Sequence, residues 1–477
     1  TYILQNNQIA LDTSPIKQSG VEIWADKADA MGFPAWTIDD SDPAAWFAST
    51  ASAREFALEG GGPTLIHVET MRGCGHAHHH DDLYLGNESG TPPGYVDRDL
   101  LEYWEAKDPL PTHRQLLLDL GLEESTLVKM ESVEQRDIVA ARQELEDMPW
   151  PEPETVTKGV TSLNDAETHE ERFSRLSTVG ESDYSDSPLE VGESTLTYAE
   201  KGGWTYARSI QQAMADIATR HGEDCMFIGE DMEVAGAFGM NMALKNAGHT
   251  DKLIDMPLCE AAIVHTGVGA ALSGMRPMVE IQFGGFAALG FNALVNNAAM
   301  LRWRWGAECP MTIRIPLGAR TRSGPFHANM IESWFANDPG LVVVAAGTPQ
   351  DAYDLLMESA ELNDPVLFLE HIGLYGLRGG LTGWGQNINQ KVDTETVKKA
   401  IANGERYKLG KAAVVRGGRD VTLVTWGSML HVAQQAAEQL ASEDIEVEIV
   451  DLRTLLPFDA QTCIDSVMRT GRLVVLQ

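Results

Sequence analysis

The run Val421-Thr422-Leu423-Val424-Thr425 opens a series of alternating segments near the end of the chain. Two more apolar runs follow it, Val447-Glu448-Ile449-Val450 and Arg472-Leu473-Val474-Val475-Leu476-Gln477, and segments of helix length separate the three runs at residues 430–441 and 459–468. Nearly continuous apolar strands that alternate with helices are typical of parallel sheets with both faces covered. These segments therefore predict an α/β domain.

The same alternation continues toward the N-terminus. A helix is expected from Tyr206 to Arg220, followed by strands that share an apolar composition, at residues 226–228, 311–316, 341–346 and 365–370. Further upstream, glycines 60–62 separate an Ala-rich helical segment, residues 42–59, from the run Pro63-Thr64-Leu65-Ile66-His67-Val68. Residues 2–5 are expected to form another strand, and a further helix is expected around residues 133–148. At 477 residues, the chain is expected to hold about three α/β domains.

Composition limits the classes of function. The chain has 36 Lys plus Arg against 70 Asp plus Glu, a formal charge of −34, which argues against a nucleic-acid clamp. No stretch is apolar for the length that a bilayer requires, and five scattered cysteines without a CxxC pair indicate a reducing compartment. We expect a cytoplasmic protein without a membrane or nucleic-acid partner. Because the sequence begins with Thr1 and ends inside an apolar run, we also expect both ends to be truncated.

A histidine-rich loop follows the strand expected to end near Thr70. Residues 72–82 read RGCGHAHHHDD and place four imidazoles and two carboxylates within seven positions. Loops that follow strands are where α/β proteins build their sites. Three interpretations fit this loop: a Zn²⁺ or Ni²⁺ site, a solvated polar loop, or an anion site in which Arg72 and an imidazole donate to phosphate. The residues alone leave all three open.

A single carboxylate stands at the head of an apolar segment in the second half. Pro257-Leu258-Cys259-Glu260-Ala261-Ala262-Ile263 begins a glycine-spaced run that extends to Gly274. Glu260 fits the first turn of a helix, where the helix dipole favours a negative charge. The alternative is a desolvated carboxyl group with a raised pKa, as catalytic acids often have.

Three further candidates lie downstream of Glu260. His327 stands in the loop 324–329 after an expected strand, where it fits either packing or catalysis. Phe283 and Phe286 would ordinarily be core residues, but the two glycines between them leave room for a planar ligand. No Gly-x-Gly-x-x-Gly opens a βαβ unit, so the sequence does not support a Rossmann nucleotide site.

Together these segments resemble the thiamine-diphosphate-dependent first component of the 2-oxoacid dehydrogenase complexes, with the α and β subunits fused in one chain. The α-like half shares residues 5–10 (QNNQIA), 60–66 (GGGPTLI), 72–76 (RGCGH) and 108–110 (DPL). The β-like half shares residues 229–231 (GED), the Glu260 segment, 274–283 (GMRPMVEIQF), 338–341 (DPGL), 368–371 (FLEH) and 451–457 (DLRTLLP).

The resemblance implies a thiamine-diphosphate-binding α/β fold with four parts. These would be an α-like diphosphate-binding domain at 1–122, a helical and acidic linker at 123–200, a β-like pyrimidine-binding domain at 201–385 and a transketolase C-terminal-like domain at 386–477. With both ends truncated, the first and last domains are expected to be incomplete.

In the β-like half, the resemblance implies that Glu260 hydrogen-bonds the aminopyrimidine ring of thiamine diphosphate and drives it to the imino tautomer. Phe283, Phe286 and Gln282 would lie beside that ring. His327 matches a catalytic histidine near the substrate and the lipoyl entry.

In the α-like half, the resemblance implies that His76 and Arg72 lie near the diphosphate. Asn7 and the carbonyl of Ile9 match ligands of the Mg²⁺ that bridges it, and hard oxygen donors suit this ion. Two features depart from the family. A Gly-Asp-Gly motif, whose aspartate is another Mg²⁺ ligand, is absent, and residues 78–80 are histidines where a serine-rich stretch is usual. Which imidazole lines the site therefore stays open.

The implied activity is oxidative decarboxylation of a small 2-oxoacid, pyruvate ahead of branched-chain acids, with acyl transfer to the lipoyl group of a dihydrolipoyl acyltransferase. Two fused chains are expected to pair into a dimer. A transketolase or a deoxyxylulose-phosphate synthase has the same domain order and is the main alternative. A non-catalytic acidic scaffold and a metal hydrolase built on the histidine-rich loop are more remote alternatives.

Overall fold

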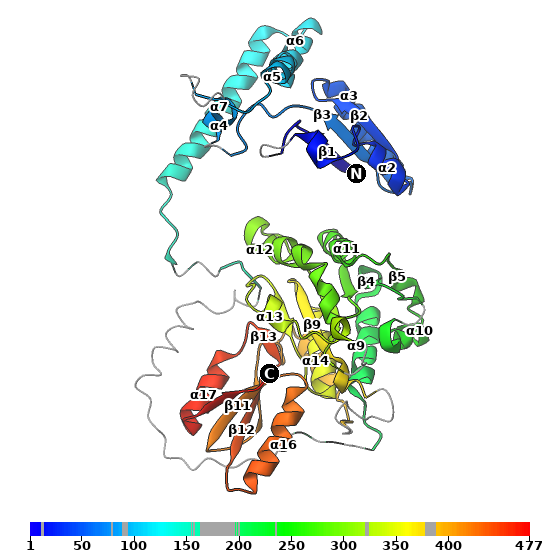
Figure 1. Cartoon of the computed structure of the whole chain (residues 1–477), viewed down its shortest axis with the longest axis vertical. Helices are drawn as coiled ribbons and strands as arrows, with labels where there is room; N and C mark the ends of the chain where they lie inside the picture. The colour runs from blue at the N-terminus through cyan, green and yellow to red at the C-terminus, as the bar shows by residue number, and fades with distance from the viewer. Residues whose placement is uncertain are drawn as a thin grey trace. The chain divides into compact units, whose positions relative to one another are not determined.

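The computed structural model describes residues 1–10, 14–77, 80–87, 94–153, 155, 158–162, 196, 198, 201–233, 236–319, 324–376 and 388–477. The chain forms two compact units, Thr1–Trp150 and Pro151–Gln477 (Figure 1). Each unit has its own sheets and core. In the described part of the chain, every helix is too short or too polar to cross a membrane.

The first unit is built on a three-stranded parallel sheet of order β1-β3-β2, formed by β1 (Tyr2–Asn6), β2 (Ala35–Asp39) and β3 (Leu65–Glu69). Helix α3 (Pro43–Leu58) begins after Asp42, whose carboxylate accepts hydrogen bonds from two backbone N–H groups of the first turn. Ala53 of α3 packs against Ile66 and Val68 of β3. The expected strands at residues 2–5 and 63–68 and the expected helix at 42–59 are thus confirmed.

The other helices of this unit are short, with one exception. They are α1 (Pro15–Gln18), α2 (Asp26–Met31), α4 (Asp81–Tyr84), α5 (Arg98–Glu105), α6 (Pro109–Asp119) and α7 (Glu124–Asp147). Helix α7 begins earlier than the helix expected around residues 133–148, and Leu127 is its one buried residue. The Ser/Asp/Glu-rich stretch of the proposed linker lies mostly outside the described residues.

The second unit contains a seven-stranded sheet of order β13-β8-β9-β7-β6-β4-β5. All neighbours are parallel except β13 and β8. Its strands are β4 (Cys225–Gly229), β5 (Leu253–Asp255), β6 (Arg276–Glu280), β7 (Thr312–Leu317), β8 (Val342–Val344), β9 (Val366–His371) and β13 (Thr454–Leu456). The four strands expected in this region are confirmed, although β8 is shorter than residues 341–346.

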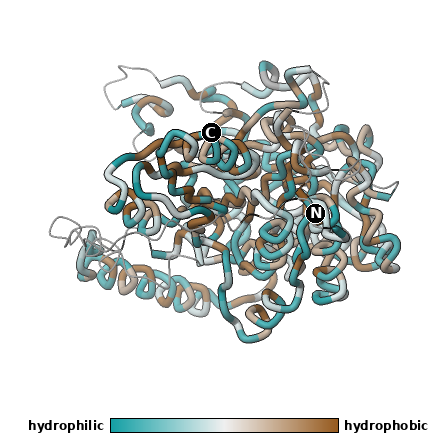
Figure 2. The backbone as a smooth tube through the Cα atoms, turned by 90° about the horizontal axis from the view of Figure 1, so that it is seen from below, coloured by the Kyte–Doolittle hydropathy of each residue, from teal (hydrophilic) through white to brown (hydrophobic). Residues whose placement is uncertain are grey.

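Both faces of this sheet are covered, which explains why its strands are apolar at successive positions. Val342 and Val344 belong to a core with helices α9 (Tyr206–His221) and α14 (Pro349–Ser359), whereas Val343 belongs to a separate core with α11 (Glu260–Leu272). Figure 2 shows apolar and polar segments alternating along the helices, as expected of helices that bury one face.

Shorter helices and turns connect these elements. The helices are α10 (Met242–Asn246), η7 (Ala293–Ala298, a π-helix), α12 (Met300–Trp305), α13 (Glu332–Phe335) and α15 (Glu395–Ala402). The 3₁₀ turns lie at Gly222–Asp224, Ala237–Gly239, Thr250–Lys252, Gly284–Ala288, Pro325–His327 and Ile372–Leu374.

The last part of the chain forms a four-stranded sheet of order β10-β12-β11-β14, made by β10 (Ala413–Arg416), β11 (Val421–Thr425), β12 (Val447–Asp451) and β14 (Leu473–Val475). β11 runs parallel to β12 and β14, as the apolar runs indicate, and β10 pairs antiparallel to β12. Helices α16 (Met429–Ala441) and α17 (Ala460–Thr470) complete the expected alternation.

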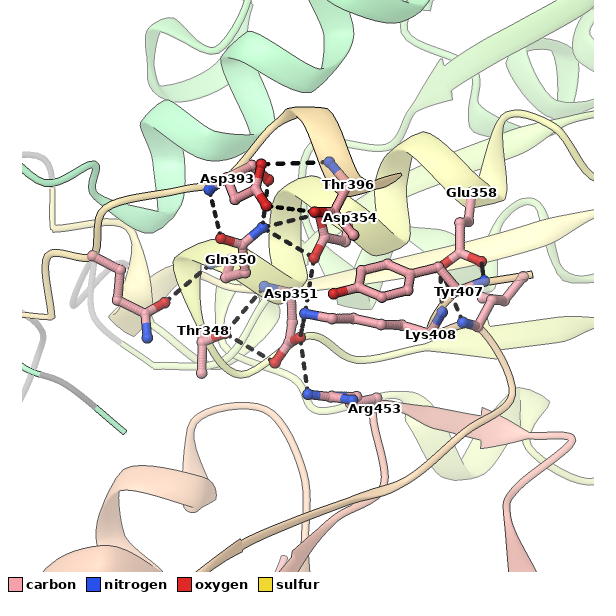
Figure 3. Close-up of polar contacts among 12 residues, drawn as sticks. Thr348, Gln350, Asp351, Asp354, Glu358, Asp393, Thr396, Tyr407, Lys408 and Arg453 are labelled. Carbon is pink, nitrogen blue, oxygen red and sulfur yellow. Dashed lines mark hydrogen bonds and ion pairs between the residues drawn. The ribbon is translucent and has the colours of Figure 1, made fainter. Parts of the chain in front are cut away.

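Two of the connections between this smaller sheet and the larger one stand out among the described residues. The first is β13, which follows β12 in sequence but pairs with β8 of the larger sheet. The second is a set of charged side chains, termed here the junction cluster: the buried Asp351, Asp354 and Asp451 with the partly buried Lys408 and Arg453. Figure 3 labels Asp351, Asp354, Lys408 and Arg453 of this cluster. Lys408 Nζ lies 2.6 Å from Asp351 Oδ1 and 2.8 Å from Asp354 Oδ2, and an Arg453 nitrogen lies 3.2 Å from Asp351 Oδ1.

Candidate active site

The parallel sheet of the second unit brings several predicted residues to one edge. In a parallel sheet the carboxyl ends of all strands lie on the same side, where α/β proteins form their sites. Glu230 follows the end of β4, Glu280 ends β6, and Glu260 begins α11 after β5. His327 lies in a 3₁₀ turn after β7. The alternation of strands and helices therefore places these residues on a common edge.

Glu260 lies in the first turn of a helix, as the first interpretation of the sequence expected, and its side chain is largely withdrawn from solvent. It is the first residue of α11, and it is only 7 % exposed. Glu230 is 6 % exposed, and burial, followed by the negative charges of Glu260, Asp231 and Glu280, raises the pKa of its carboxyl group. The carboxylates at this edge thus lie close enough to influence one another, and the Glu230 carboxyl group retains its proton to higher pH than an ordinary glutamate.

The aromatic candidates form a connected group. The His327 ring lies edge-on to Phe283 and Phe286, with ring centroids 4.6 Å and 5.3 Å apart, and the two phenylalanines are 5.6 Å from each other. Phe238 adds a fourth ring 5.7 Å from Phe283. His327 Nδ1 is buried and has no hydrogen-bond partner among the described residues. An imidazole nitrogen in this state is available to a group that enters the site.

The glycines between the two phenylalanines serve a different purpose from the one expected. A Cβ atom at Gly285 would lie 2.7 Å from the carbonyl oxygen of Phe326, and one at Gly284 would lie 2.9 Å from that of Asn329. The glycines therefore admit the backbone of the 325–329 loop, which carries His327. Their space is filled by protein and is not open to a planar ligand.

Gln282 lies beside the acidic end of β4. Its Nε2 atom is 3.5 Å from the carbonyl oxygen of Glu230 and 3.4 Å from Asp231 Oδ2. These are long contacts, so the amide is only loosely held.

A buried ion-pair group beneath this edge was not identified from the sequence. We term it the site cluster: Glu280, Arg314 and Glu370, on β6, β7 and β9, each at most 2 % exposed. Arg314 donates to Glu280 at 2.6 Å and to both oxygens of Glu370 at 2.6 and 2.9 Å. The sequence could have indicated this group, because each of these charged residues interrupts an apolar strand and a buried charge requires a partner.

The predicted residues of the first unit also gather at the carboxyl end of their sheet. Asn7 follows β1 and Arg72 follows β3, and the Arg72 backbone N–H donates to the Asn7 carbonyl at 3.1 Å. The Arg72 side chain donates to the carbonyls of Ala10 (2.6 Å) and Cys74 (2.9 Å). Asn7 Oδ1 accepts from the Ile9 N–H at 3.3 Å, which is the turn that an asparagine alone would form.

The histidine-rich loop is described only in part. The rings of His76 and His80 are stacked with centroids 6.5 Å apart. His78 and His79 lie outside the described residues. In the described part of the chain, no group of three or more His, Cys, Asp or Glu residues could hold a metal ion.

The two halves fit thiamine diphosphate and Mg²⁺ unequally. The edge of the second unit offers what an aminopyrimidine ring requires: a buried carboxyl group on Glu260, aromatic rings, and an unpartnered nitrogen on His327. The first unit offers the amide oxygen of Asn7 and nearby carbonyls, without a described carboxylate cluster. The residues present thus fit the pyrimidine part, and they supply only part of a Mg²⁺ ligand set.

Comparison with known families covers most of the chain. Residues 1–154 match the family described as dehydrogenase E1 component, residues 203–377 match the transketolase pyrimidine binding domain, and residues 410–477 match the transketolase C-terminal domain. The β subunit of the pyruvate dehydrogenase E1 component from Staphylococcus epidermidis is 36% identical over 276 residues, which cover 57% of this chain and 79% of that protein. The chain belongs to the E1 family of thiamine-diphosphate-dependent 2-oxoacid dehydrogenases.

Two further relatives refine this assignment. The β subunit of acetoin:2,6-dichlorophenolindophenol oxidoreductase from Cupriavidus necator is 42% identical over 250 residues, covering 52% of the E1 chain and 68% of that protein. The pyruvate dehydrogenase E1 β subunit of Bacillus subtilis is 36% identical over 261 residues, covering 54% and 75%. Among solved structures, a split-gene transketolase described as an inactive β4 tetramer aligns with a TM-score of 0.43 and 18% identity over 57% of the E1 chain and 80% of that chain. The E1 match at residues 1–154 favours the dehydrogenase over the transketolase alternative.

Proposed function

We propose that the E1 chain oxidatively decarboxylates pyruvate and passes the acyl group to the lipoyl group of a dihydrolipoyl acyltransferase. The observation that carries this proposal is the burial of Glu260 at the carboxyl edge of the sheet, beside Glu230 and on the same edge as the loop that carries His327. An enzyme of this family requires a carboxyl group in that position that is withdrawn from water.

The residues of this edge have separable roles in the proposal. Thiamine diphosphate, when bound, supplies the electron sink for decarboxylation. Glu260 holds a proton at the aminopyrimidine ring nitrogen, and its burial strengthens that hydrogen bond. Phe283 and Phe286 keep water from the ring. His327 presents its unpartnered Nδ1 to the substrate, where it can donate or accept a proton.

In the first unit, the proposal assigns the diphosphate to the carboxyl end of the small parallel sheet. Asn7 Oδ1 and the Ile9 carbonyl would hold Mg²⁺ once the turn between them opens. Arg72 and His76 would stabilise the diphosphate charge. Arg72 already bonds to the carbonyls of Ala10 and Cys74, which orders the loop that leads to His76.

The proposal also includes pairing of two E1 chains. Large apolar side chains lie exposed on α12, with Trp303 62 % and Trp305 68 % exposed, and Leu289 after the 3₁₀ turn Gly284–Ala288 is 66 % exposed. Exposed apolar residues of this size are usual at protein interfaces. The second copy and the acyltransferase are the two partners that the proposal names.

Acetoin is a second candidate substrate, because the acetoin oxidoreductase β subunit shares 42% identity with the E1 chain. Cleavage of acetoin and decarboxylation of pyruvate both break the carbon–carbon bond next to a carbonyl group. Branched-chain 2-oxoacids rank behind both.

The test is turnover with an artificial electron acceptor on the full chain supplied with thiamine diphosphate and Mg²⁺. Pyruvate, acetoin, 2-oxoisovalerate and 2-oxoglutarate are compared for the unmodified chain and for Glu260→Gln. Glu448→Gln is the matched control, because Glu448 is a buried glutamate of the second unit on β12 of the other sheet. We expect pyruvate to give the highest kcat/KM and only Glu260→Gln to abolish it. Full activity of Glu260→Gln would overturn the mechanism, and preference for acetoin would overturn the substrate.

A further inference from the structure

Glu69 holds the two residues on either side of Asn7. It is the last residue of β3, and its partner in the register with β1 is Asn6. Its Oε2 atom accepts a hydrogen bond from Asn6 Nδ2 at 3.0 Å and another from Gln8 Nε2 at 2.7 Å. One carboxylate oxygen therefore ties down the chain both before and after a residue to which the proposed function assigns a Mg²⁺ ligand.

Gln8 has a backbone conformation that needs support. Its φ is +65°, in the left-handed region that residues other than glycine rarely adopt. Residues held in this region persist where their surroundings fix them. The Gln8 side chain supplies two such contacts, one to Glu69 and one to the carbonyl oxygen of Asn6 at 3.1 Å. Of these two, the bond to Glu69 is the one that reaches outside the turn that carries Asn7 and Ile9.

The backbone of Asn7 is anchored, whereas its side chain is held weakly. The Asn7 carbonyl accepts a hydrogen bond from the Arg72 N–H at 3.1 Å, and the Asn7 N–H donates to the Gln5 carbonyl at 3.0 Å. Asn7 Oδ1 accepts from the Ile9 N–H at 3.3 Å, which is long for such a bond. The amide can therefore turn toward a ligand while the chain on both sides of it stays in place.

A buried histidine restricts the other oxygen of Glu69. His67 lies two residues earlier on β3, on the same face of the strand, and it is fully buried. Its Nε2 atom has no aligned hydrogen-bond partner among the described residues, but it lies 3.1 Å from Glu69 Oε1. Its Nδ1 atom lies 3.3 Å from the Thr37 hydroxyl on β2. The imidazole thus occupies the space beside Oε1 and leaves Oε2 to face the turn.

We propose that Glu69 is a positioning residue for the cation that accompanies the diphosphate. It fixes Asn6 and Gln8 so that the Asn7 amide oxygen and the Ile9 carbonyl are presented together. Its described hydrogen bonds go to neither of these two residues, so it acts through the turn. Ligands that are already held in place lose less freedom on binding, so the site binds more tightly. The inference rests on the proposed roles of Asn7 and Ile9.

The test measures metal binding without turnover. The full chain, at a fixed concentration of thiamine diphosphate, is titrated with Mn²⁺, and free Mn²⁺ is counted by electron paramagnetic resonance. Mn²⁺ takes the same oxygen ligands as Mg²⁺. Glu69→Leu removes the acceptor and keeps a side chain of similar size. Loss of a residue that orients metal ligands weakens metal binding by about 10-fold to 100-fold. Because Glu69 acts through the turn, we expect the Mn²⁺ dissociation constant to rise by about 10-fold, the lower end of that range.

Two further variants show whether the effect belongs to the acceptor. Glu69→Gln keeps one oxygen, which can take both bonds because Asn6 and Gln8 donate to the same atom, so it should retain Mn²⁺ binding. Asp39→Leu is the matched control. Asp39 ends β2 and is the register partner of Glu69 on the other side of β3, but its carboxylate bonds to Ser41 and Lys107. It should lower the midpoint of thermal unfolding and leave the Mn²⁺ dissociation constant unchanged.

Each outcome decides the matter. Weaker Mn²⁺ binding by Glu69→Leu, with binding retained in Glu69→Gln and Asp39→Leu, supports the proposal. Unchanged binding by Glu69→Leu, or an equal loss in either of the other two variants, overturns it. If Glu69→Leu does not fold, Gln8→Gly decides, because glycine accepts the left-handed backbone but lacks the amide that Glu69 holds. Unchanged binding in that variant overturns the proposal. Normal Mn²⁺ binding by Asn7→Leu, measured alongside, would instead overturn the proposed metal site, so the two failures are distinguishable.

Discussion

The second unit contains two buried charge groups that are similar in composition and different in surroundings. The site cluster sets two carboxylates against one guanidinium, and the junction cluster sets three carboxylates against Lys408 and Arg453. Each has one more acid than base. The site cluster borders the carboxylates beside Glu260, whereas the junction cluster is enclosed between α14, the segment before β10 and the β12–β13 turn (Figure 3). We therefore expect substitutions near the site cluster to affect catalysis and substitutions within the junction cluster to affect stability.

Glu260→Gln tests the catalytic side of this comparison, and we expect it to have the largest effect on the rate of turnover. Glutamine keeps the size of the side chain but cannot exchange a proton with the cofactor ring. Loss of a positioned acid–base group costs about 10² to 10⁴-fold in rate. We expect kcat with pyruvate to fall by at least that factor in a steady-state assay.

The same variant should not be less stable than the unmodified chain. Removing the charge of Glu260 relieves its repulsion with Glu230, so the midpoint of thermal unfolding should stay unchanged or rise. A fall in the midpoint that accounts for the lost activity would show that Glu260 is structural.

Lys408→Met should give the largest effect on the stability side. It leaves Asp354 without its cation and Asp351 with Arg453 alone. Breaking a buried ion pair by removing one partner costs about 3–5 kcal/mol. We expect that loss in urea unfolding, with kcat unchanged in the folded fraction.

Lys398→Met is the matched control. Lys398 also pairs with an aspartate, Asp216, at 2.8 Å, but its side chain is 39 % exposed. A partly exposed pair is worth about 0–1 kcal/mol. Equal losses in the two lysine variants would mean that the junction cluster is no more tightly coupled than a surface pair.

Asp451→Asn should reveal a pH dependence of stability that belongs to the junction. Burial and the charge of Asp351 raise the pKa of Asp451 to about 7, from an ordinary value of 3.8. Between these two pKa values the folded state holds a proton that the unfolded state has released. The contribution of Asp451 to the free energy of unfolding is therefore fully present below about pH 4 and is lost as the pH rises to about 7.

Asparagine removes that titration and should flatten the curve. A rise in pKa of this size corresponds to about 4 kcal/mol of stability over that pH range. The measurement is the free energy of unfolding between pH 4 and pH 8 for both proteins. Parallel curves would show that Asp451 is not the group that titrates.

The two clusters also mark the limit of what the sequence could predict. Apolar runs located the strands and the sheet edge because burial on both faces leaves a local pattern, and Glu260 could be recognised at the head of an apolar segment. The partners of Arg314 lie 34 and 56 positions away, and those of Lys408 lie 57 and 54 positions away. A pattern along the chain shows that a buried charge needs a partner, but only the strand order shows which residue supplies it.

The glycines at positions 284 and 285 illustrate the same limit. Their small size was recognised, but whether a ligand or a loop occupies the space depends on where residues 325–329 return to the sheet. The extent of α7 was underestimated for a related reason. Its residues are almost all exposed, so no apolar face marks where the helix begins.

Phe283→Leu tests whether the aromatic rings belong to the site, and we expect it to have the smallest effect on stability and cofactor binding. Phe283 contacts His327, Phe286 and Phe238 edge-on, and an aromatic pair contributes about 0.5–1.5 kcal/mol beyond its buried area. We expect a loss of about 1 kcal/mol in unfolding free energy, a rise of a few-fold in the concentration of thiamine diphosphate that half-saturates the chain, and a changed NMR signal for the His327 imidazole.

The matched control is Phe335→Leu. Phe335 is fully buried and contacts Phe291 and Trp334, away from His327. It should cost at least as much stability while leaving cofactor saturation and the His327 signal unchanged. If Phe283→Leu behaves in the same way as Phe335→Leu, the four rings are ordinary core, and the functional edge of the sheet shrinks to the carboxylates alone. If only Phe283→Leu moves the His327 signal, the aromatic group belongs to the functional edge of the sheet together with the carboxylates.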